Sequence, residues 1–137
     1  MKYMLDTNIC IFVIRHQKKS VIKRITQHAP ADIVISCITV SELEYGCEKS
    51  ATPQKNRIAL MEFLSPFDVA LFGSAAAHRY GMLRAQLERE GKPTGAMDML
   101  IAAHCLAIDA TLITNNTRDF KNINDISLTD WTIQKRD

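Results

Sequence analysis

Short apolar runs alternate along this chain with longer stretches that repeat their apolar positions at helical spacing. The runs that suit buried strands cover residues 2–5, 33–36, 67–71 and 110–114, with a shorter edge strand at 126–128. Three consecutive β-branched residues from Ile33 to Ile35 favour a strand that is buried on both faces. Strands that alternate with helices indicate βαβ units, so we expect an α/β domain of three layers around a mainly parallel sheet of four to five strands.

Helix signals fill the intervals between these runs. We expect helices at residues 9–15, 20–27, 39–49, 53–64, 74–90 and 97–108, and a loop at residues 92–95. The fourth helix begins at Pro53, a favoured residue in a first turn, and the fifth stops before Gly91, a common residue just after a helix. One apolar stripe runs along the fifth helix, formed by Ala76, Tyr80, Leu83 and Leu87.

A chain of 137 residues is long enough for one hydrophobic core, so we expect a single domain over residues 1–137. Its 47% apolar residues are typical of a globular protein, and its net charge of +2 neither requires nor excludes nucleic acid as a partner. The N-terminal segment lacks the pattern of a secretory signal, and the longest apolar run, around residues 99–108, is far too short to span a bilayer. We therefore expect a cytoplasmic protein with no membrane segment.

The four cysteines (Cys10, Cys37, Cys47 and Cys105) form no CxxC pair and lie within apolar stretches. We expect them to be buried free thiols in a reducing compartment. The four histidines form no HExxH or HxH pattern, which argues against a zinc site.

Polar residues stand where the predicted strands end, at the edge of the sheet where ligands of open α/β proteins gather. Asp6 follows the first strand, Ser36 the second, and Asn115 and Asn116 the fourth. Asp6 is therefore a candidate functional carboxylate. The alternative is a plain N-cap, because an aspartate in front of a helix serves well as one.

Asp98 lies on a helix face that its neighbours make apolar. At 100° per residue it shares that face with Ile101, Ala102 and Cys105. A buried ionised carboxylate is costly unless it is paired or bound to a metal. Asp98 is therefore a second candidate, with capping of the helix start as the alternative.

Glu42 gives a weaker signal of the same kind. It lies between Ile38 and Tyr45 on one face of its predicted helix. Glu44 and Glu48 are spaced i, i+4 on another face, which we expect to be solvated. One of the three glutamates in this segment is thus predicted to face inward.

Three carboxylates in one site would repel one another. Two such charges about 4 Å apart repel by roughly 4 kcal/mol at an effective dielectric constant of ~20. A cation among them would relieve this repulsion, and oxygen ligands without His or Cys favour Mg²⁺, or Mn²⁺, over zinc. Such a metal can generate a hydroxide nucleophile and neutralise charge on a phosphoryl group, so the pattern favours phosphodiester hydrolysis.

Four segments match a known family in order and spacing: Met4-Leu5-Asp6-Thr7-Asn8, Ser41-Glu42-Leu43-Glu44-Tyr45-Gly46, Asp98 ahead of an Ile-Ala-Ala-His helix, and Thr114-Asn115-Asn116-Thr117-Arg118-Asp119-Phe120. With these segments the chain resembles the PIN domain and, more closely, the VapC toxins of bacterial toxin–antitoxin pairs, from residue 2 to residue 131. The resemblance implies a single PIN-like domain and a Mg²⁺-dependent endoribonuclease, with Mn²⁺ as an alternative metal. Such enzymes cut structured cellular RNA, commonly tRNA.

The resemblance also assigns roles to the three candidate carboxylates. Asp6 and Asp98 match the main metal ligands of the family. Glu42 matches its third acidic position. All three are therefore expected to be catalytic.

The fourth acidic position departs from the usual pattern. Many relatives carry Asp where this chain has Asn116, whereas Asp119 matches another acidic position of this branch. Asp119 would then complete the site directly or through water. Asn116 and Thr114 would act as neutral hydrogen-bonding partners in or next to the metal site.

Partners are implied in the same way. Relatives form homodimers, and their cognate VapB antitoxin inserts a C-terminal peptide into the active-site groove. We therefore expect an RNA substrate, a VapB-type antitoxin and a homodimer, with contact to DNA only indirectly through the antitoxin.

Basic residues gather at the second predicted helix, namely Lys18, Lys19, Lys23 and Arg24. Our hypothesis is that this cluster contacts RNA phosphates. The alternative is a solvated helix face, as we expect for Arg84, which can pair with Glu88 at i, i+4.

Two other classes of protein share parts of this pattern. A response-regulator receiver domain needs an acidic pair after its first strand and an Asp after its third, where this chain has a single acid and Gly73. A PIN-like module that binds RNA or protein without catalysis would keep the fold and lose the chemistry. The three main acids are intact, which favours the enzyme.

Overall fold

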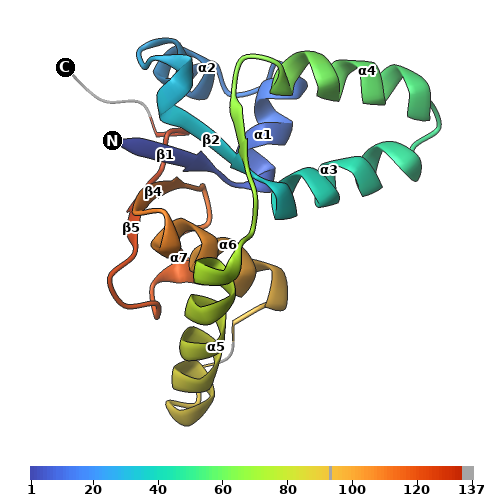
Figure 1. Cartoon of the computed structure of the whole chain (residues 1–137). Coiled ribbons are helices and arrows are strands. Elements are labelled where there is room, and N and C mark those ends of the chain that lie inside the picture. Colours follow the sequence, from blue (N-terminus) through green and yellow to red (C-terminus); the bar gives the residue numbers. More distant parts are fainter. Residues whose placement is uncertain (93, 134–137) are drawn as a thin grey trace.

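The computed structural model describes residues 1–92 and 94–133 and contains a five-stranded sheet with helices on both of its faces (Figure 1). All four strand pairings are parallel, and the spatial order is β3-β2-β1-β4-β5. The strands are β1 (Lys2–Leu5), β2 (Ile33–Ser36), β3 (Asp68–Ala70), β4 (Ala110–Ile113) and β5 (Ser127–Thr129). The predicted three-layer α/β architecture with a parallel sheet is confirmed.

The predicted helices are all present, and most begin a residue or two earlier than expected. They are α1 (Thr7–Ile14), α2 (Lys19–Thr26), α3 (Cys37–Glu48), α4 (Pro53–Leu64), α5 (Ser74–Arg89) and α6 (Ala96–Ala107). The early starts have a local cause in α1 and α3. Asp6 and Ser36 each accept a hydrogen bond from a backbone N–H in the first turn, so the residue after each of them is already helical.

Two short helices were not predicted: the 3-10 helix η1 (Pro30–Asp32) and α7 (Thr117–Phe120). Each spans about one turn, which is too short for a periodic apolar pattern to appear. The helix α7 matters for the site because it follows directly on the polar end of β4.

The sheet divides the core in two, and alternate residues of β1 point to opposite sides. Met4 packs in the cluster beneath α5 and α6, whereas Leu5 packs in the cluster beneath α1 and α2. The second strand alternates in the same way, with Val34 in the first cluster and Ile35 in the second. Both faces of the central strands are therefore buried, as their β-branched sequence indicates.

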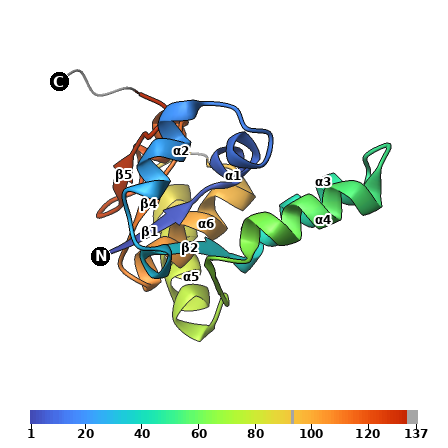
Figure 2. The ribbon, with the colours of Figure 1, turned by 90° about the horizontal axis from the view of Figure 1, so that it is seen from above.

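Helices α3 and α4 lie side by side and project from the sheet as an arm (Figure 2). Arg57 on α4 contacts two glutamates of α3, with its Nε 3.5 Å from Glu44 Oε2 and its Nη2 2.6 Å from Glu48 Oε2. Both glutamate side chains are still partly exposed, 45% for Glu44 and 69% for Glu48, so the expected solvated face is confirmed, and the ion pairs with Arg57 are an addition to it. The sequence spacing placed them on one face, but the cation that meets them comes from a different helix.

Other local predictions are confirmed. Along α5, Ala76, Leu83 and Leu87 are buried and Tyr80 is half-buried, so the apolar stripe faces the core. Arg84 pairs with Glu88 on the same helix, with 3.1 Å between Nε and Oε1. The predicted loop at 92–95 includes residue 93, which lies outside the described residues.

All four cysteines are free, as expected. Cys10, Cys47 and Cys105 are buried, whereas Cys37 is only half-buried and accepts a hydrogen bond from the backbone N–H of Phe72 at 3.3 Å. Among the described residues, no helix is both long and apolar enough to cross a membrane.

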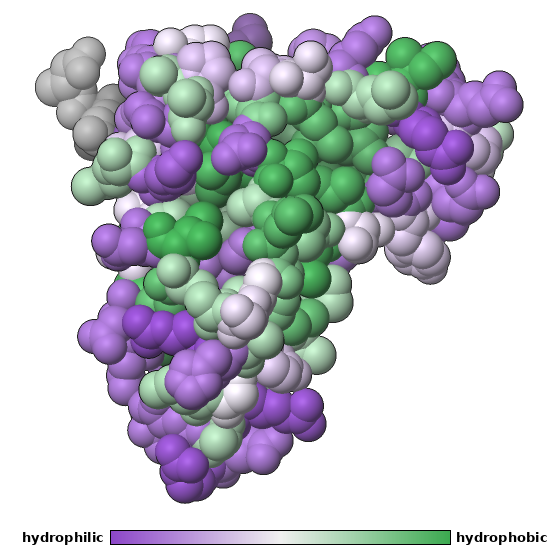
Figure 3. All heavy atoms as spheres, viewed as in Figure 1, coloured by the Kyte–Doolittle hydropathy of each residue, from purple (hydrophilic) through white to green (hydrophobic). Residues whose placement is uncertain are grey.

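Apolar side chains gather at the centre of one face of the molecule, over the segment that links α4 to α5 (Figure 3). Leu71 lies in this segment, and 82% of its surface is exposed. Isolated exposed apolar residues are normal, but a gathered set of them often marks a contact surface.

Candidate active site

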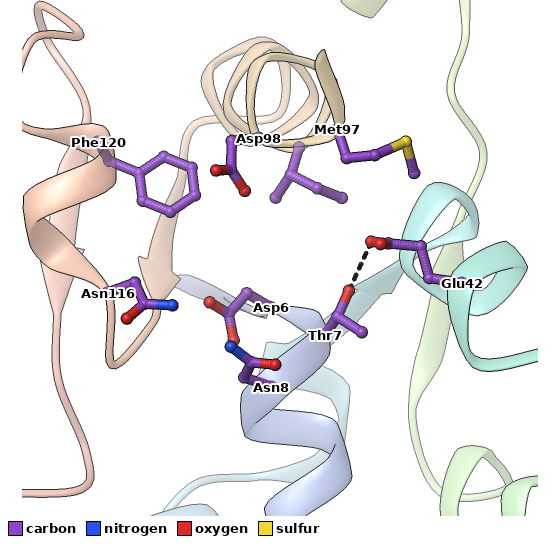
Figure 4. A pocket seen from close by; sticks show the side chains of 9 residues that line it. Asp6, Thr7, Asn8, Glu42, Met97, Asp98, Asn116 and Phe120 are labelled. Carbon is purple, nitrogen blue, oxygen red and sulfur yellow. Dashed lines mark hydrogen bonds between the residues drawn. The ribbon is translucent and has the colours of Figure 1, made fainter. Parts of the chain in front are cut away.

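A cavity of about 160 Å³ opens at the edge of the sheet where the central strands end (Figure 4). Its walls come from the starts of α1 and α6, from α3, and from the segment after β4. The lining residues are Asp6, Thr7, Asn8, Glu42, Met97, Asp98, Ile101, Asn116 and Phe120. Segments far apart in the sequence thus bring all three candidate carboxylates to one cavity.

Asp6 is both an N-cap and a cavity residue. Its Oδ1 accepts a hydrogen bond from the backbone N–H of Ile9 at 3.0 Å, and the side chain of Thr114 lies near enough to the carboxylate to lower its pKa. Only 8% of the residue is exposed, and this burial raises its pKa from 3.8 to about 6. Asp6 can therefore be both an N-cap and a functional carboxylate. Capping uses one carboxylate oxygen, and the side chain still lines the cavity.

Glu42 projects from α3 toward the start of α1 (Figure 4). Its Oε1 accepts a hydrogen bond from the Thr7 hydroxyl at 2.8 Å. The predicted inward face of this helix needs a correction at Tyr45, which is 66% exposed, although Ile38 is half-buried against the core. Glu42 faces a cavity at the end of the sheet rather than the apolar core, and Tyr45, about one turn further along α3, is already exposed.

Asp98 lies in the first turn of α6 and is half-buried. Its pKa is raised mainly by burial, and further by the negative charges of Asp119 and Glu42. Within the described residues its carboxylate accepts no hydrogen bond from the helix backbone, and the N-cap position is held by Gly95. The geometry therefore gives no support to capping as the role of Asp98.

The end of β4 contributes neutral groups. Thr114 is fully buried, and its oxygen accepts a hydrogen bond from the backbone N–H of Asn116 at 3.0 Å. Asn116 lines the cavity directly. Asp119, on α7, is exposed and does not line the cavity, but it lies near enough for its charge to raise the pKa of Asp98.

No fixed cation compensates these acids within the part of the chain that the structure describes. None of its lysines, arginines or histidines forms an ion pair with Asp6, Glu42 or Asp98. In the same residues, no three His, Cys, Asp or Glu side chains lie close enough together to hold a metal ion as they stand. The carboxylates thus surround the cavity without converging on one point.

This arrangement fits a hydrated hard cation better than a fully caged one. Mg²⁺ binds carboxylate oxygens, keeps several of its waters, and needs only one or two direct protein ligands. Asp6 and Asp98 could supply those ligands, and Glu42 could act through a bound water. A cation so held can activate water and neutralise charge on a phosphoryl group.

The predicted RNA-binding residues lie elsewhere on the surface. Lys18 precedes α2, and Lys19, Lys23 and Arg24 are part of it. None of the four lines the cavity, and the Nζ of Lys18 lies 5.9 Å from the ring centre of Phe12.

Some cavity residues had no predicted role. Thr7 and Asn8 were assigned no role of their own, although their position next to Asp6 was a usable signal. Met97 and Phe120 form apolar parts of the wall, and Phe120 could not be placed there without the short helix α7.

Comparison with known proteins gives a consistent result. Residues 3–126 match the model of the PIN domain. The chain is 40% identical over 132 residues to the tRNA(fMet)-specific endonuclease VapC of Shigella flexneri, covering 96% of this chain and 99% of that protein.

Solved structures are similar over the same length. The crystal structure of VapBC2 from Rickettsia felis bound to a promoter DNA fragment includes a chain with a TM-score of 0.90 and 39% identity, covering 96% of this chain and 99% of that one. The crystal structure of DNA-bound VapBC from Salmonella typhimurium includes a chain with a TM-score of 0.91 and 38% identity. The match covers 96% of this chain and 98% of that one.

Proposed function

This chain belongs to the PIN-domain family and to its VapC branch, and we propose that it is the toxin of a VapBC-type toxin–antitoxin pair. In this proposal it is a cytoplasmic endoribonuclease that hydrolyses phosphodiester bonds of tRNA or another structured RNA. Mg²⁺ is its cofactor, with Mn²⁺ as a substitute, and a cognate VapB-type antitoxin inhibits it.

One observation carries the catalytic part of the proposal. Asp6, Glu42 and Asp98 meet at one cavity, and no cation of the described residues pairs with any of them. Burial and neighbouring negative charges raise the pKa of Asp6 and of Asp98, which means that their ionised forms are less favourable in the protein alone than in water. A divalent cation would stabilise those ionised forms.

Each residue of the cavity has a different role in this proposal. Asp6 and Asp98 would hold the cation, and Glu42 would orient a water at the site. Thr114 lies near the Asp6 carboxylate and lowers its pKa, and the side chain of Asn116 would offer hydrogen bonds to the phosphodiester. A bound Mg²⁺ supplies an activated water as nucleophile and neutralises negative charge on the phosphoryl oxygens.

Asp119 has an outer role in this scheme. It is exposed on α7 and does not line the cavity, so it would act on a bound metal only through water. The neutral Asn116 occupies the wall in its place.

The partners follow from the relatives. The neighbouring structures from Rickettsia felis and Salmonella typhimurium are VapBC complexes on DNA, so we expect a VapB-type antitoxin to cover this cavity and to mediate any contact with DNA. We also expect a homodimer, and the apolar side chains that gather over the segment linking α4 to α5 support a protein contact of this kind.

The test of the proposed function is cleavage of tRNA and other structured RNA by the purified protein with added Mg²⁺. The parent should cut, and Asp6→Asn and Asp98→Asn should not. If both variants cut as well as the parent, the activity is a contaminant or the site is wrong. If the parent never cuts although it binds RNA, the non-catalytic PIN-like module is the better description.

A separate test addresses the basic cluster at α2. Replacing Lys18, Lys19, Lys23 and Arg24 by Gln should flatten the dependence of RNA binding on salt, because each phosphate contact that is lost lowers the slope by about 1. An unchanged slope would show that this helix face is only solvated.

A further inference from the structure

Thr7 connects two elements of the cavity. It is the first residue of α1 and follows Asp6 directly. Its hydroxyl donates a hydrogen bond to Glu42 Oε1 at 2.8 Å, across 35 positions of sequence (Figure 4). The bond therefore joins the helix that begins at Asp6 to the helix that carries Glu42.

This hydroxyl is the one polar partner of Glu42 among the described residues. No lysine, arginine or histidine in that part of the chain pairs with the Glu42 carboxylate, and no second hydrogen bond reaches it. The negative charge of Glu42 is the smallest of three causes that raise the pKa of Asp98, after burial and the charge of Asp119. Repulsion between the two carboxylates therefore tends to turn the half-exposed Glu42 side chain away from the cavity.

We propose that Thr7 is a positioning residue that holds Glu42 at the cavity against this repulsion. The proposal rests on the proposed function, since it takes Glu42 to act on a hydrated divalent cation. The hydrogen bond occupies Oε1 and leaves Oε2 free to face a water of that cation.

A threonine suits this position for physical reasons. Its hydroxyl is neutral, so it orients Glu42 without cancelling the negative charge that attracts the cation. Its β-branch restricts rotation about χ1, and the helix start fixes its backbone beside Asp6. A lysine in the same place would bind Glu42 more strongly and compete with the metal.

The test measures metal binding directly, without RNA. Mn²⁺ alone is titrated into the parent and variants, and free Mn²⁺ is followed by electron paramagnetic resonance. Thr7→Val keeps the shape of the side chain and removes the hydroxyl, and we expect it to weaken Mn²⁺ binding by about 10-fold, as for other groups that orient a ligand. Thr7→Ser restores the hydroxyl and should bind Mn²⁺ like the parent.

Thr26→Val is the matched control. Thr26 also donates one hydrogen bond, to the carbonyl of Lys23 at 2.7 Å, but it lies on α2 and does not line the cavity. This variant should leave Mn²⁺ binding unchanged. Melting temperatures of all variants show whether they are folded, and Thr7→Ala serves in place of Thr7→Val if the valine disturbs the helix start.

A double-mutant cycle separates positioning from a general structural effect. In a Glu42→Gln background, Thr7→Val should weaken Mn²⁺ binding no further, because the group it positions is gone. If Thr7→Val binds Mn²⁺ like the parent while Glu42→Gln does not, Thr7 has no positioning role and the proposed function stands. Equal losses in both backgrounds would also overturn the inference. If neither Glu42→Gln nor Asp6→Asn weakens Mn²⁺ binding, the metal site itself is wrong, and the inference falls with it.

Discussion

Glutamates in two regions of α3 have opposite electrostatic surroundings. Glu44 and Glu48 lie on the outer arm, where the Arg57 guanidinium contacts both of them. Glu42 lies two residues before Glu44 but faces the cavity that also holds Asp6 and Asp98. Its one hydrogen-bond donor among the described residues is a neutral hydroxyl.

The difference lies in the counter-charge. On the arm, carboxylates and a guanidinium form exposed ion pairs, which contribute only ~0.2–1 kcal/mol each. At the cavity, burial and neighbouring negative charges raise the pKa of Asp6 and of Asp98, so a bound cation would stabilise their ionised forms. Carboxylates that pair with a guanidinium of the protein stabilise the fold slightly. Carboxylates without such a partner are available to bind a ligand.

The rate of RNA cleavage should show the largest difference between substitutions at the cavity and on the arm. Glu42→Gln should lower the Mg²⁺-dependent rate by about 100-fold, because in the proposed mechanism Glu42 orients a water at the metal. Glu48→Gln makes the same chemical change on the arm and should leave the rate unaltered. The measurement is single-turnover cleavage at saturating Mg²⁺, and equal rates for the two variants would abolish the distinction between the regions.

Asp6→Asn should stabilise the metal-free protein at pH 7. The folded pKa of about 6 lies above the ordinary value of 3.8, so keeping Asp6 ionised costs up to about 3 kcal/mol of unfolding free energy. Asparagine can still accept the bond from Ile9, so the helix cap survives. Urea unfolding with EDTA measures the effect, and a less stable variant would mean that the carboxylate is structurally required.

The pH dependence of the unfolding free energy tests the raised pKa of Asp6 more directly. A carboxyl with a raised folded pKa favours the folded state below the unfolded pKa, and this contribution is lost as the pH rises through the folded pKa. Between pH 7 and pH 5 the parent should therefore gain about 1 kcal/mol relative to Asp6→Asn.

Taking the difference between the two proteins is necessary because His104 acts in the opposite direction. Burial lowers the pKa of this histidine, so its protonation in the unfolded chain destabilises both proteins as the pH falls below about 6.5. Its contribution cancels in the difference. A parent and variant with parallel pH curves would contradict the raised pKa of Asp6.

Asp98→Asn should have a smaller effect of the same sign. Asp98 is only half-buried, so the melting temperature of the metal-free protein should stay the same or rise slightly. The stabilisation that the parent gains on adding Mg²⁺ should disappear in the variant. A clear fall in the melting temperature without metal would make Asp98 a structural residue, as a helix cap would be.

The arm should give the smallest response. Arg57→Gln removes both ion pairs and should cost about 0.5 kcal/mol of unfolding free energy, an effect that high salt reduces. RNA cleavage should not change. A loss of cleavage would mean that the arm helps to shape the site through Glu42.

Much of the architecture could be read from local patterns. The β-branched run at 33–36 and the periodic helix at 74–90 each depend on burial that repeats along a short segment, and the structure contains both elements close to their predicted bounds. The single turn of α7 could not be read in this way, because four residues contain no period. The strand order also depends on contacts between distant segments, which no local pattern encodes.

In the candidate site, too, single residues could be predicted from local sequence features, but the contacts between them could not. Asp6 could be singled out because a polar residue at the end of a buried strand is a local feature, and Asp98 because it interrupts an apolar stripe. Their meeting with Glu42 at one cavity depends on β1 lying beside β4 and on α3 and α6 starting at the same edge of the sheet. The contact of Arg57 with Glu44 and Glu48 depends likewise on the packing of α4 against α3, and the bond from Thr7 to Glu42 on the approach of α1 to α3.

The amino-acid sequence thus determined which residues carry charge, which segments form strands and helices, and which acids stand out from their surroundings, because each of these properties depends on neighbours in the chain. Only the tertiary structure decided which carboxylates meet a cation and which meet one another. Electrostatic energy depends on distance in space, and the decisive distances here join residues that lie from 9 positions apart in the sequence, as for Arg57 and Glu48, to 92 positions apart, as for Asp6 and Asp98.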